Sequence, residues 1–436
     1  MKTAKRLLTA LLAALLTLSL TACDTGGGNS NGKVDIPTSQ SGSDDFQKNL
    51  HQAIRWLGGL PSFLETDTGY YVGYGWLYYL DKETMKMTIV CGKPDCDHSD
   101  PNICNAMIEE DFLLTGGERI YYLGATNDPK QVKSVKFDAL EHKVVQELKF
   151  QETSASQSSY DLAIYHRGYI YYVSDDILYR VKLGGEKDSA EAIWSPANAG
   201  EVQSHGGLVD FNPNAIRYTL WADGNMLYFM AKVQISDGTR KDVLFQCDLT
   251  DMIVKQVWAT PGKEEVGEWE RTGVSVSQWY VMGGYIYFYL SGGDMWRTEL
   301  ATGKTEKLAD THEQTQYGSA IFSDDYMCLL NDVPVNNYTD REFALGSNRR
   351  SNGDTIFVYG IDGTLLKEIS LKPLLDELGD ISTIDMLMCD GSDVYFLTTS
   401  MTFSTQLGWA VGDIDAITLC RANFETGKVS QVYKLR

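Results

Sequence analysis

The sequence contains an aromatic strand pattern that returns seven times, and this repeat limits the fold more than any other feature. Each copy is a turn residue followed by a short run rich in tyrosine, phenylalanine and tryptophan, and successive copies lie 41 to 67 residues apart. The copies occupy residues 75–79, 119–122, 168–172, 225–229, 284–288, 325–329 and 393–396. Such spacing is typical of four-stranded sheets with insertions, repeated around an axis.

A second part of the repeat is a strand, a tight turn and another strand. Strands at 178–183, 295–300 and 419–424 are followed by Gly184, Gly303 and Gly427. Glycine supplies the positive φ of such a turn at little steric cost. An arginine recurs in each of these three strands, and we expect it to occupy a similar place in each sheet.

Several of the repeated strands are apolar on both faces, as at 285–290. A strand between two neighbouring sheets needs this pattern, whereas a strand of a one-sided sheet alternates polar and apolar residues. We therefore predict an all-β, seven-bladed β-propeller over 69–436, with six or eight blades as the alternatives. Which end of the chain supplies a ring-closing strand stays open. The best helical pattern within the propeller is 371–378.

The first residues read as a secretory signal. Lys2, Lys5 and Arg6 precede an apolar run that is too short to span a membrane, and the run ends in small residues before Cys23. This order resembles the lipobox of bacterial lipoproteins, which implies cleavage after residue 22 and diacylation of the Cys23 thiol. The expected location is the outer face of the cytoplasmic membrane, with the folded domain extracellular.

Two further segments precede the propeller. Residues 23–44 are rich in Gly, Ser, Asn and Thr and are predicted to be a flexible tether, and 45–68 are predicted to be a short helical lead-in. The formal net charge of the chain is −21, and it becomes −24 without the three basic residues of the signal. Such an acidic chain repels phosphate backbones, which argues against a nucleic-acid partner. Membrane contact is expected through the lipid alone.

The strand units at 77–81 and 419–423 resemble the propeller of low-density-lipoprotein-receptor type proteins. Related domains occur in bacterial surface lipoproteins, and the resemblance implies a propeller over about 69–436. The receptor family's Tyr-Trp-Thr-Asp strand is not present in full form, so that family's ligand-binding roles do not transfer to this chain.

Residues 91–104 depart from the strand repeat. Cys91, Cys96, His98 and Cys104 lie within this insertion, which is similar to a segment of secreted lipoproteins from Gram-positive, Clostridia-like gut bacteria. Three thiolates and one imidazole can complete a closed tetrahedral zinc shell. A disulfide among the cysteines, or free thiols, are the alternatives. Under a zinc or a disulfide interpretation, the segment staples the loop between the first two blades.

Four other cysteines, Cys247, Cys328, Cys389 and Cys420, lie inside apolar strand patterns. A buried cysteine behaves as a small apolar residue, and we expect this of each. Pairing between blades, for example of Cys389 with Cys420, stays open.

No catalytic motif is found, and no Gly-x-Ser-x-Gly elbow occurs. The leading hypothesis is a non-catalytic binding or scaffolding propeller that recognises a glycan, a peptide or a partner protein at the cell surface. Trp269, Trp279 and Trp409 are the candidates for its ligand face. The alternative is an extracellular enzyme that acts on polysaccharide or peptide.

Overall fold

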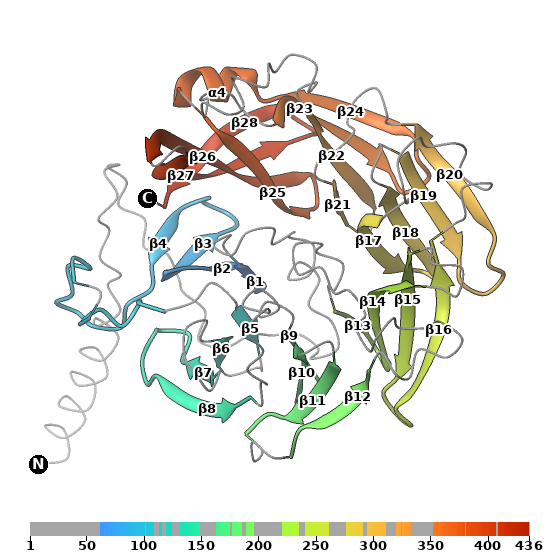
Figure 1. The fold of residues 1–436 in the computed structure, drawn as a ribbon. Helices are drawn as coiled ribbons and strands as arrows, with labels where there is room; N and C mark the ends of the chain where they lie inside the picture. The colour runs from blue at the N-terminus through green and yellow to red at the C-terminus, as the bar shows by residue number, and fades with distance from the viewer. Residues whose placement is uncertain are drawn as a thin grey trace, which may run out of the picture. The chain divides into compact units, whose positions relative to one another are not determined.

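In the residues that it describes, the computed structural model forms seven four-stranded antiparallel sheets and one short helix, the organisation of a seven-bladed β-propeller. The prediction of seven blades is confirmed. The sheets are numbered 1 to 7 in chain order, from blue to red in Figure 1. The structure describes residues 62–100, 102–108, 113–115, 119–123, 131–148, 163–174, 177–184, 189–195, 220–234, 240–260, 276–290, 294–310, 320–323, 325–332, 352–379, 381–406 and 409–435.

Sheets 1 and 2 fall in one compact unit, and sheets 3 to 7 fall in a second. In the first unit, the strands of sheet 1 are β1 (Ser62–Glu65), β2 (Gly69–Tyr74), β3 (Trp76–Asp81) and β4 (Met87–Ile89). Those of sheet 2 are β5 (Leu113–Thr115), β6 (Ile120–Leu123), β7 (Gln131–Val135) and β8 (Lys143–Glu147). Sheet 1 thus begins inside the segment 45–68 that was predicted to be a helical lead-in.

The second unit holds the remaining five sheets and helix α4 (Lys372–Leu378), which matches the predicted helical segment. Sheet 3 is β9 (Ala163–His166), β10 (Tyr169–Ser174), β11 (Ile177–Lys182) and β12 (Glu191–Trp194). Sheet 4 is β13 (Trp221–Asp223), β14 (Met226–Gln234), β15 (Arg240–Asp248) and β16 (Ile253–Ala259). Sheet 5 is β17 (Val276–Met282), β18 (Tyr285–Leu290), β19 (Asp294–Glu299) and β20 (Thr305–Asp310). Sheet 6 is β21 (Ala320–Phe322), β22 (Tyr326–Asp332), β23 (Asn352–Gly360) and β24 (Leu365–Ser370). Sheet 7 is β25 (Thr383–Asp390), β26 (Asp393–Gln406), β27 (Trp409–Asn423) and β28 (Lys428–Lys434).

Each sheet contains four consecutive strands, so none of the described sheets combines strands from the two ends of the chain. Six of the seven aromatic copies form the second strand of their sheet, as predicted for a repeat. The copy at 75–79 differs, because it forms β3, the third strand of sheet 1, and the second strand is β2. This copy therefore occupies a different place in its sheet from the other six copies.

The core of the second unit lies between neighbouring sheets. One cluster of buried side chains joins sheets 4, 5 and 6, a second joins sheets 6 and 7, and a third joins sheets 3 and 4. Strand β18 is buried at five successive positions after Tyr285. Both faces of the strand are therefore covered, as its apolar pattern predicted.

The arginine that recurs in the third strands makes an ion pair in all three sheets. Glycines 184, 303 and 427 have φ values of 73°, 71° and 71°, so the tight turns that follow these strands are also as predicted. Exposed ion pairs contribute little to stability, and these pairs mainly fix side-chain positions at the sheet surface. The pairs are Arg180 with Glu191, Arg297 with Glu306, and Arg421 with Asp393.

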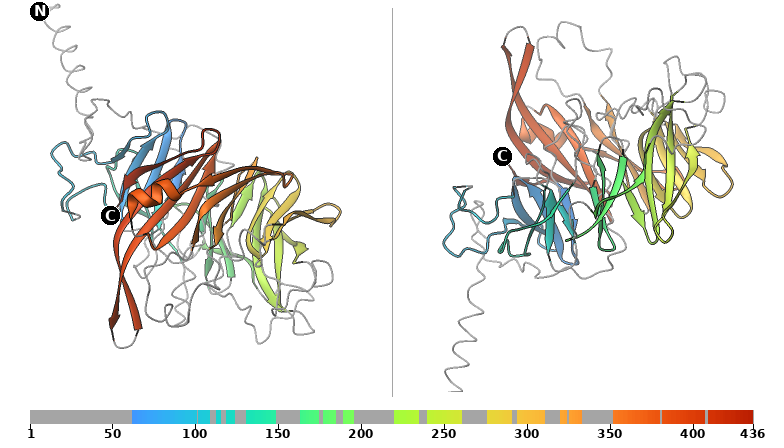
Figure 2. Two further views of the ribbon diagram at one scale, coloured as in Figure 1. Left: turned by 90° about the horizontal axis from the view of Figure 1, so that it is seen from above. Right: turned by 60° about the horizontal axis from the view of Figure 1, so that its bottom comes forward.

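Strands β26 and β27 continue beyond the rest of sheet 7. The pairing of β25 with β26 starts at Thr383 and Thr399, whereas β26 and β27 remain paired as far as Gln406 and Trp409. The extra residues form a two-stranded hairpin that projects from the sheet in both views of Figure 2.

Candidate metal centre

The insertion after β4 brings all four predicted ligands together. One ligand atom each from Cys91, Cys96, His98 and Cys104 lies within 4.8 Å of every other, so this group can hold a metal ion. In a tetrahedral zinc shell with Zn–S bonds of about 2.3 Å, ligand atoms lie roughly 3.5–3.8 Å apart. The observed cluster therefore needs only small side-chain movements to reach that geometry.

Local backbone turns position the four side chains. The Cys96 amide donates to the carbonyl of Lys93 at 3.4 Å, and the Cys104 amide donates to the carbonyl of Asp100 at 3.1 Å. His98 has a φ of 59°, in the left-handed region that few residues with a side chain adopt. These bends turn a 14-residue segment back on itself, so its first and last cysteines meet.

The insertion is attached to sheet 1. The Leu77 amide donates to the carbonyl of Ala106 at 2.7 Å, the Ile108 amide donates to the carbonyl of Gly75 at 3.0 Å, and Trp76 pairs with Met107. Trp76 also packs against the small buried cluster that contains Cys96 and Cys104. The last part of the insertion therefore runs along the edge of β3.

The same insertion also contacts sheet 2. The carbonyl of Asn105, next to Cys104, lies 2.8 Å from Nε2 of His142, the residue directly before β8. A Cβ atom on Gly92 would lie 2.5 Å from Cγ of Leu140, so this residue packs directly against the turn between β7 and β8. The insertion lies between sheets 1 and 2, where it was predicted to act.

The electrostatics of the cluster favour a bound cation. Burial raises the pKa of Cys104, and together with the neighbouring thiols of Cys96 and Cys91 it brings that pKa to about 12. Burial also acts to raise the pKa of Cys91, but hydrogen bonds to the backbone at Lys93 and Asn105 and to the other two thiols outweigh it and lower that pKa. Three thiols this close do not all ionise without a positive charge among them.

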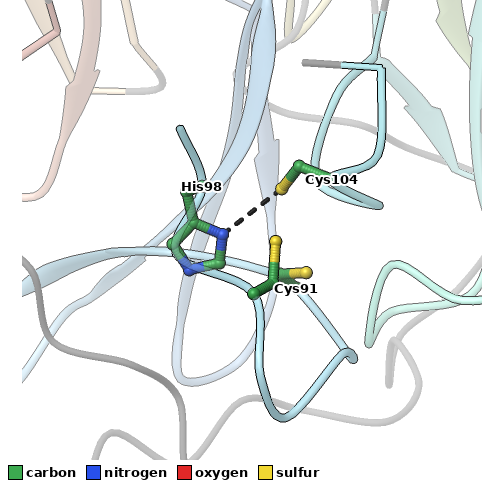
Figure 3. A group of neighbouring side chains, drawn as sticks. Cys91, His98 and Cys104 are labelled. Atoms are coloured by element: carbon green, nitrogen blue, oxygen red, sulfur yellow. Dashed lines mark hydrogen bonds between the residues drawn. The ribbon is translucent and has the colours of Figure 1, made fainter. Parts of the chain in front are cut away.

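His98 is in the form that metals bind. Burial lowers the pKa of the imidazole, which keeps it neutral near physiological pH. Its Nδ1 lies 3.3 Å from Sγ of Cys104, and Figure 3 shows the ring directed toward the Cys91 and Cys104 sulfurs. Its Nε2 is buried without a hydrogen-bond partner in the described structure. Thiolate sulfur and neutral imidazole nitrogen are the donors that zinc prefers.

Of the three tryptophans predicted for a ligand face, Trp279 is the one whose side chain lies in the described part of the structure. Trp279 lies on β17 and is 9% exposed, inside the core cluster of sheets 4 to 6. That burial leaves little of its indole for stacking on a ligand. Trp409 begins β27. Trp269 lies outside the described residues, as do Cys23 and the predicted signal peptide, tether and lead-in up to residue 61.

The structure also reveals a pair of groups that the sequence did not indicate. Cys389 was considered as a partner of Cys420, but its sulfur lies 3.3 Å from the sulfur of Cys328 instead. No spacing rule links Cys328 and Cys389, because they lie 61 residues apart. Only the packing of sheet 6 against sheet 7 brings them together.

No protein-family model matches the chain, and no curated protein matches its sequence. The resemblances to bacterial lipoproteins and to the receptor-type propeller therefore stay predictions. Among the described residues, no helix is long and apolar enough to cross a membrane.

Several solved structures are similar to the chain at low identity. The computationally designed Ika8 protein is 9% identical with a TM-score of 0.41, over 80% of this chain and 96% of that chain. Oligogalacturonate lyase from Vibrio parahaemolyticus is 9% identical with a TM-score of 0.41, over 72% and 73%. TolB from Acinetobacter baumannii is 12% identical with a TM-score of 0.32, over 85% and 77%. Similarity at this level says nothing about function.

Proposed function

We propose that this chain is a lipid-anchored surface protein whose propeller is a non-catalytic binding or scaffolding domain with a structural zinc ion at Cys91, Cys96, His98 and Cys104. The observation that carries the zinc proposal is the convergence of three sulfurs and one imidazole within 4.8 Å. The wider role rests on the fold and on the signal-like N-terminal sequence.

The composition of the cluster supports a structural ion. Catalytic zinc has three protein ligands and an open position for water or substrate, whereas four protein ligands close the shell. When bound, the ion supplies positive charge that stabilises the thiolates. The protein's part is to hold the four donors, through the left-handed backbone at His98 and the turns at Lys93 and Asp100.

A bound ion would cross-link the insertion where it meets two sheets. Residues 105–108 contact sheet 1 and His142, which directly precedes β8, and Gly92 contacts the turn between β7 and β8. With the four ligands fixed to one ion, both ends of the insertion are held against these sheets. Such a staple suits an extracellular domain that has to keep its loops ordered for a partner.

The surface location is supported by the order of basic residues, apolar run and Cys23 in the sequence. The expected partner is a glycan, a peptide or a protein, since the acidic charge disfavours nucleic acid. Changing Cys23→Ala removes the acylated thiol and should shift the chain from the membrane fraction to the medium. Retention of this variant in the membrane fraction would overturn the lipid anchor.

The test of the metal centre is elemental analysis of the full chain purified in detergent. The wild-type chain should carry about one zinc ion, and Cys104→Ser should lose most of it, because a hydroxyl is a far weaker zinc ligand than a thiolate. Cys247→Ser is the matched control, since Cys247 is also buried but lies on β15 of sheet 4. Equal zinc content per chain in Cys104→Ser and Cys247→Ser would refute the proposed metal site.

The binding role is tested by thermal-shift assays of the zinc-loaded chain against polysaccharide, oligosaccharide and peptide panels. A ligand at 100 times its Kd should stabilise the chain by about 2.7 kcal/mol. A rise in melting temperature with a ligand that stays chemically intact supports a binding module. Cleavage of a ligand would overturn the non-catalytic proposal and favour the enzyme alternative.

A further inference from the structure

Two cysteine sulfurs meet in the core between sheet 6 and sheet 7. Cys328 lies on β22 and Cys389 lies on β25, and their Sγ atoms are 3.3 Å apart. The side chains are 0% and 2% exposed. The pair therefore spans the boundary between two blades in a part of the core that solvent does not reach.

Regular strand pairing fixes the backbone of both residues. Cys328 is paired with Ile321 of β21 on one side and with Val358 of β23 on the other. Cys389 is paired with Val394 of β26. The short distance between the sulfurs thus follows from the packing of two well-formed sheets against each other.

A third cysteine in the same core cluster does not share this arrangement. The sulfur of Cys420 lies 3.9 Å from the Thr398 hydroxyl and 3.7 Å from the Thr418 carbonyl oxygen. It is also fully buried, at 0% exposed. Burial in this core does not by itself bring two sulfurs together, and Cys420 is a matched control for the pair.

We propose that Cys328 and Cys389 form a disulfide bond that joins sheet 6 to sheet 7 when the chain folds in an oxidising environment. A disulfide bond is about 2.05 Å long, so the sulfurs have to approach by about 1.2 Å. Rotation of the two side chains about their Cα–Cβ bonds supplies movements of this size. The oxidising environment follows from the proposed surface location, although the chemistry can be tested without it.

The oxidant is an external disulfide, either an oxidised dithiol protein or an oxidised low-molecular-weight thiol. One protein thiolate attacks it, forms a mixed disulfide and releases one thiol. The second protein thiolate then attacks the bonded protein sulfur and releases the other thiol. The two protein thiols lose two protons and two electrons, and the external disulfide gains them.

The bond forms before the core closes. Burial raises the pKa of Cys389 well above its ordinary value, which removes the attacking thiolate from the folded protein. During folding, the two thiols come together as sheet 6 begins to pack against sheet 7, while the oxidant can still reach them. Once buried, the bond is protected from external thiols.

The test is oxidative refolding of the full chain in detergent with oxidised and reduced glutathione and excess zinc, which protects the cysteines of the metal centre. After denaturation, free thiols are alkylated, and the products are digested and analysed by mass spectrometry. We expect one linked peptide that contains both Cys328 and Cys389, with a mass lower by two hydrogen atoms.

Two variants make the result specific. In Cys328→Ala, Cys389 should become fully alkylated, whereas in Cys420→Ala the linked peptide should persist. Alkylation of both Cys328 and Cys389 in the refolded wild-type chain would overturn the proposal, as would a link from Cys389 to Cys420. A failure of the surface location would instead appear in the fractionation of Cys23→Ala and leave the linked peptide intact.

Discussion

Removal of the proposed bond between sheets 6 and 7 should destabilise the oxidised protein by a predictable amount. The two cysteines are 61 residues apart in the chain. Chain-entropy theory gives about 4 kcal/mol of stabilisation for a closed loop of this length. Cys389→Ala also removes a buried sulfur, which costs about 1 kcal/mol by comparison with the loss of a methyl-sized group from a core.

Cys420→Ala removes a sulfur from the same cluster without breaking the proposed bond. The difference in the free energy of unfolding between Cys389→Ala and Cys420→Ala therefore gives the contribution of the bond. This difference should be about 4 kcal/mol after oxidative refolding and near zero in a strong reductant.

The assay is guanidinium unfolding followed by tryptophan fluorescence. For a slope of roughly 4–6 kcal/mol/M, the midpoint of oxidised Cys389→Ala should lie ~0.7–1 M below that of oxidised Cys420→Ala. In reductant the two midpoints should coincide. Coincident midpoints under both conditions would refute the reasoning, because no bond would then constrain the unfolded chain.

Three further predictions concern the metal insertion, the pH dependence and the core. Gly92→Ala should lower the free energy of unfolding by about 1–3 kcal/mol and weaken zinc binding several-fold, because the new methyl group overlaps Leu140. Unchanged zinc affinity in a competition titration would contradict the contact of the insertion with the turn between β7 and β8. Burial raises the pKa of Asp385, so the folded state binds more protons and stability falls as pH rises through that pKa. Asp385→Asn should therefore raise the melting temperature near neutral pH but not in acid, and a uniform shift at all pH values would refute this assignment. Phe288→Ala should lower the free energy of unfolding by about 3–5 kcal/mol, because the ring is fully buried against Trp258. A decrease below about 1 kcal/mol in denaturant unfolding would contradict the packing between sheets 4 and 5.

The sequence was sufficient to predict the fold class, because each blade repeats the same local pattern. The aromatic strands, the glycine turns at Gly184, Gly303 and Gly427, and the helix after Leu371 all follow from local rules. The exception is sheet 1, where β2 and β3 are both aromatic strands after a glycine. Only the pairing of strands decides which of them is the second strand, and pairing is not local.

The cysteine contacts likewise include one group that local spacing indicates and one pair that depends on packing between sheets. Cys91, Cys96, His98 and Cys104 lie close enough in the chain for their spacing to indicate a metal site. The contact of Cys328 with Cys389 depends instead on two sheets that meet across 61 residues. Trp279 was expected on a ligand face, but its side chain is buried in the core that joins sheets 4, 5 and 6.

X-ray absorption at the zinc edge of the full chain is the decisive measurement for the metal centre, because it reports the atoms that surround the ion. We expect three sulfur ligands at about 2.3 Å and one nitrogen ligand at about 2.0 Å. In His98→Ala, the nitrogen ligand should be lost from the zinc shell, and the three sulfur ligands should remain. A shell of nitrogen and oxygen atoms alone, or a chain that binds no zinc when refolded with it, would contradict the Cys91, Cys96, His98 and Cys104 site.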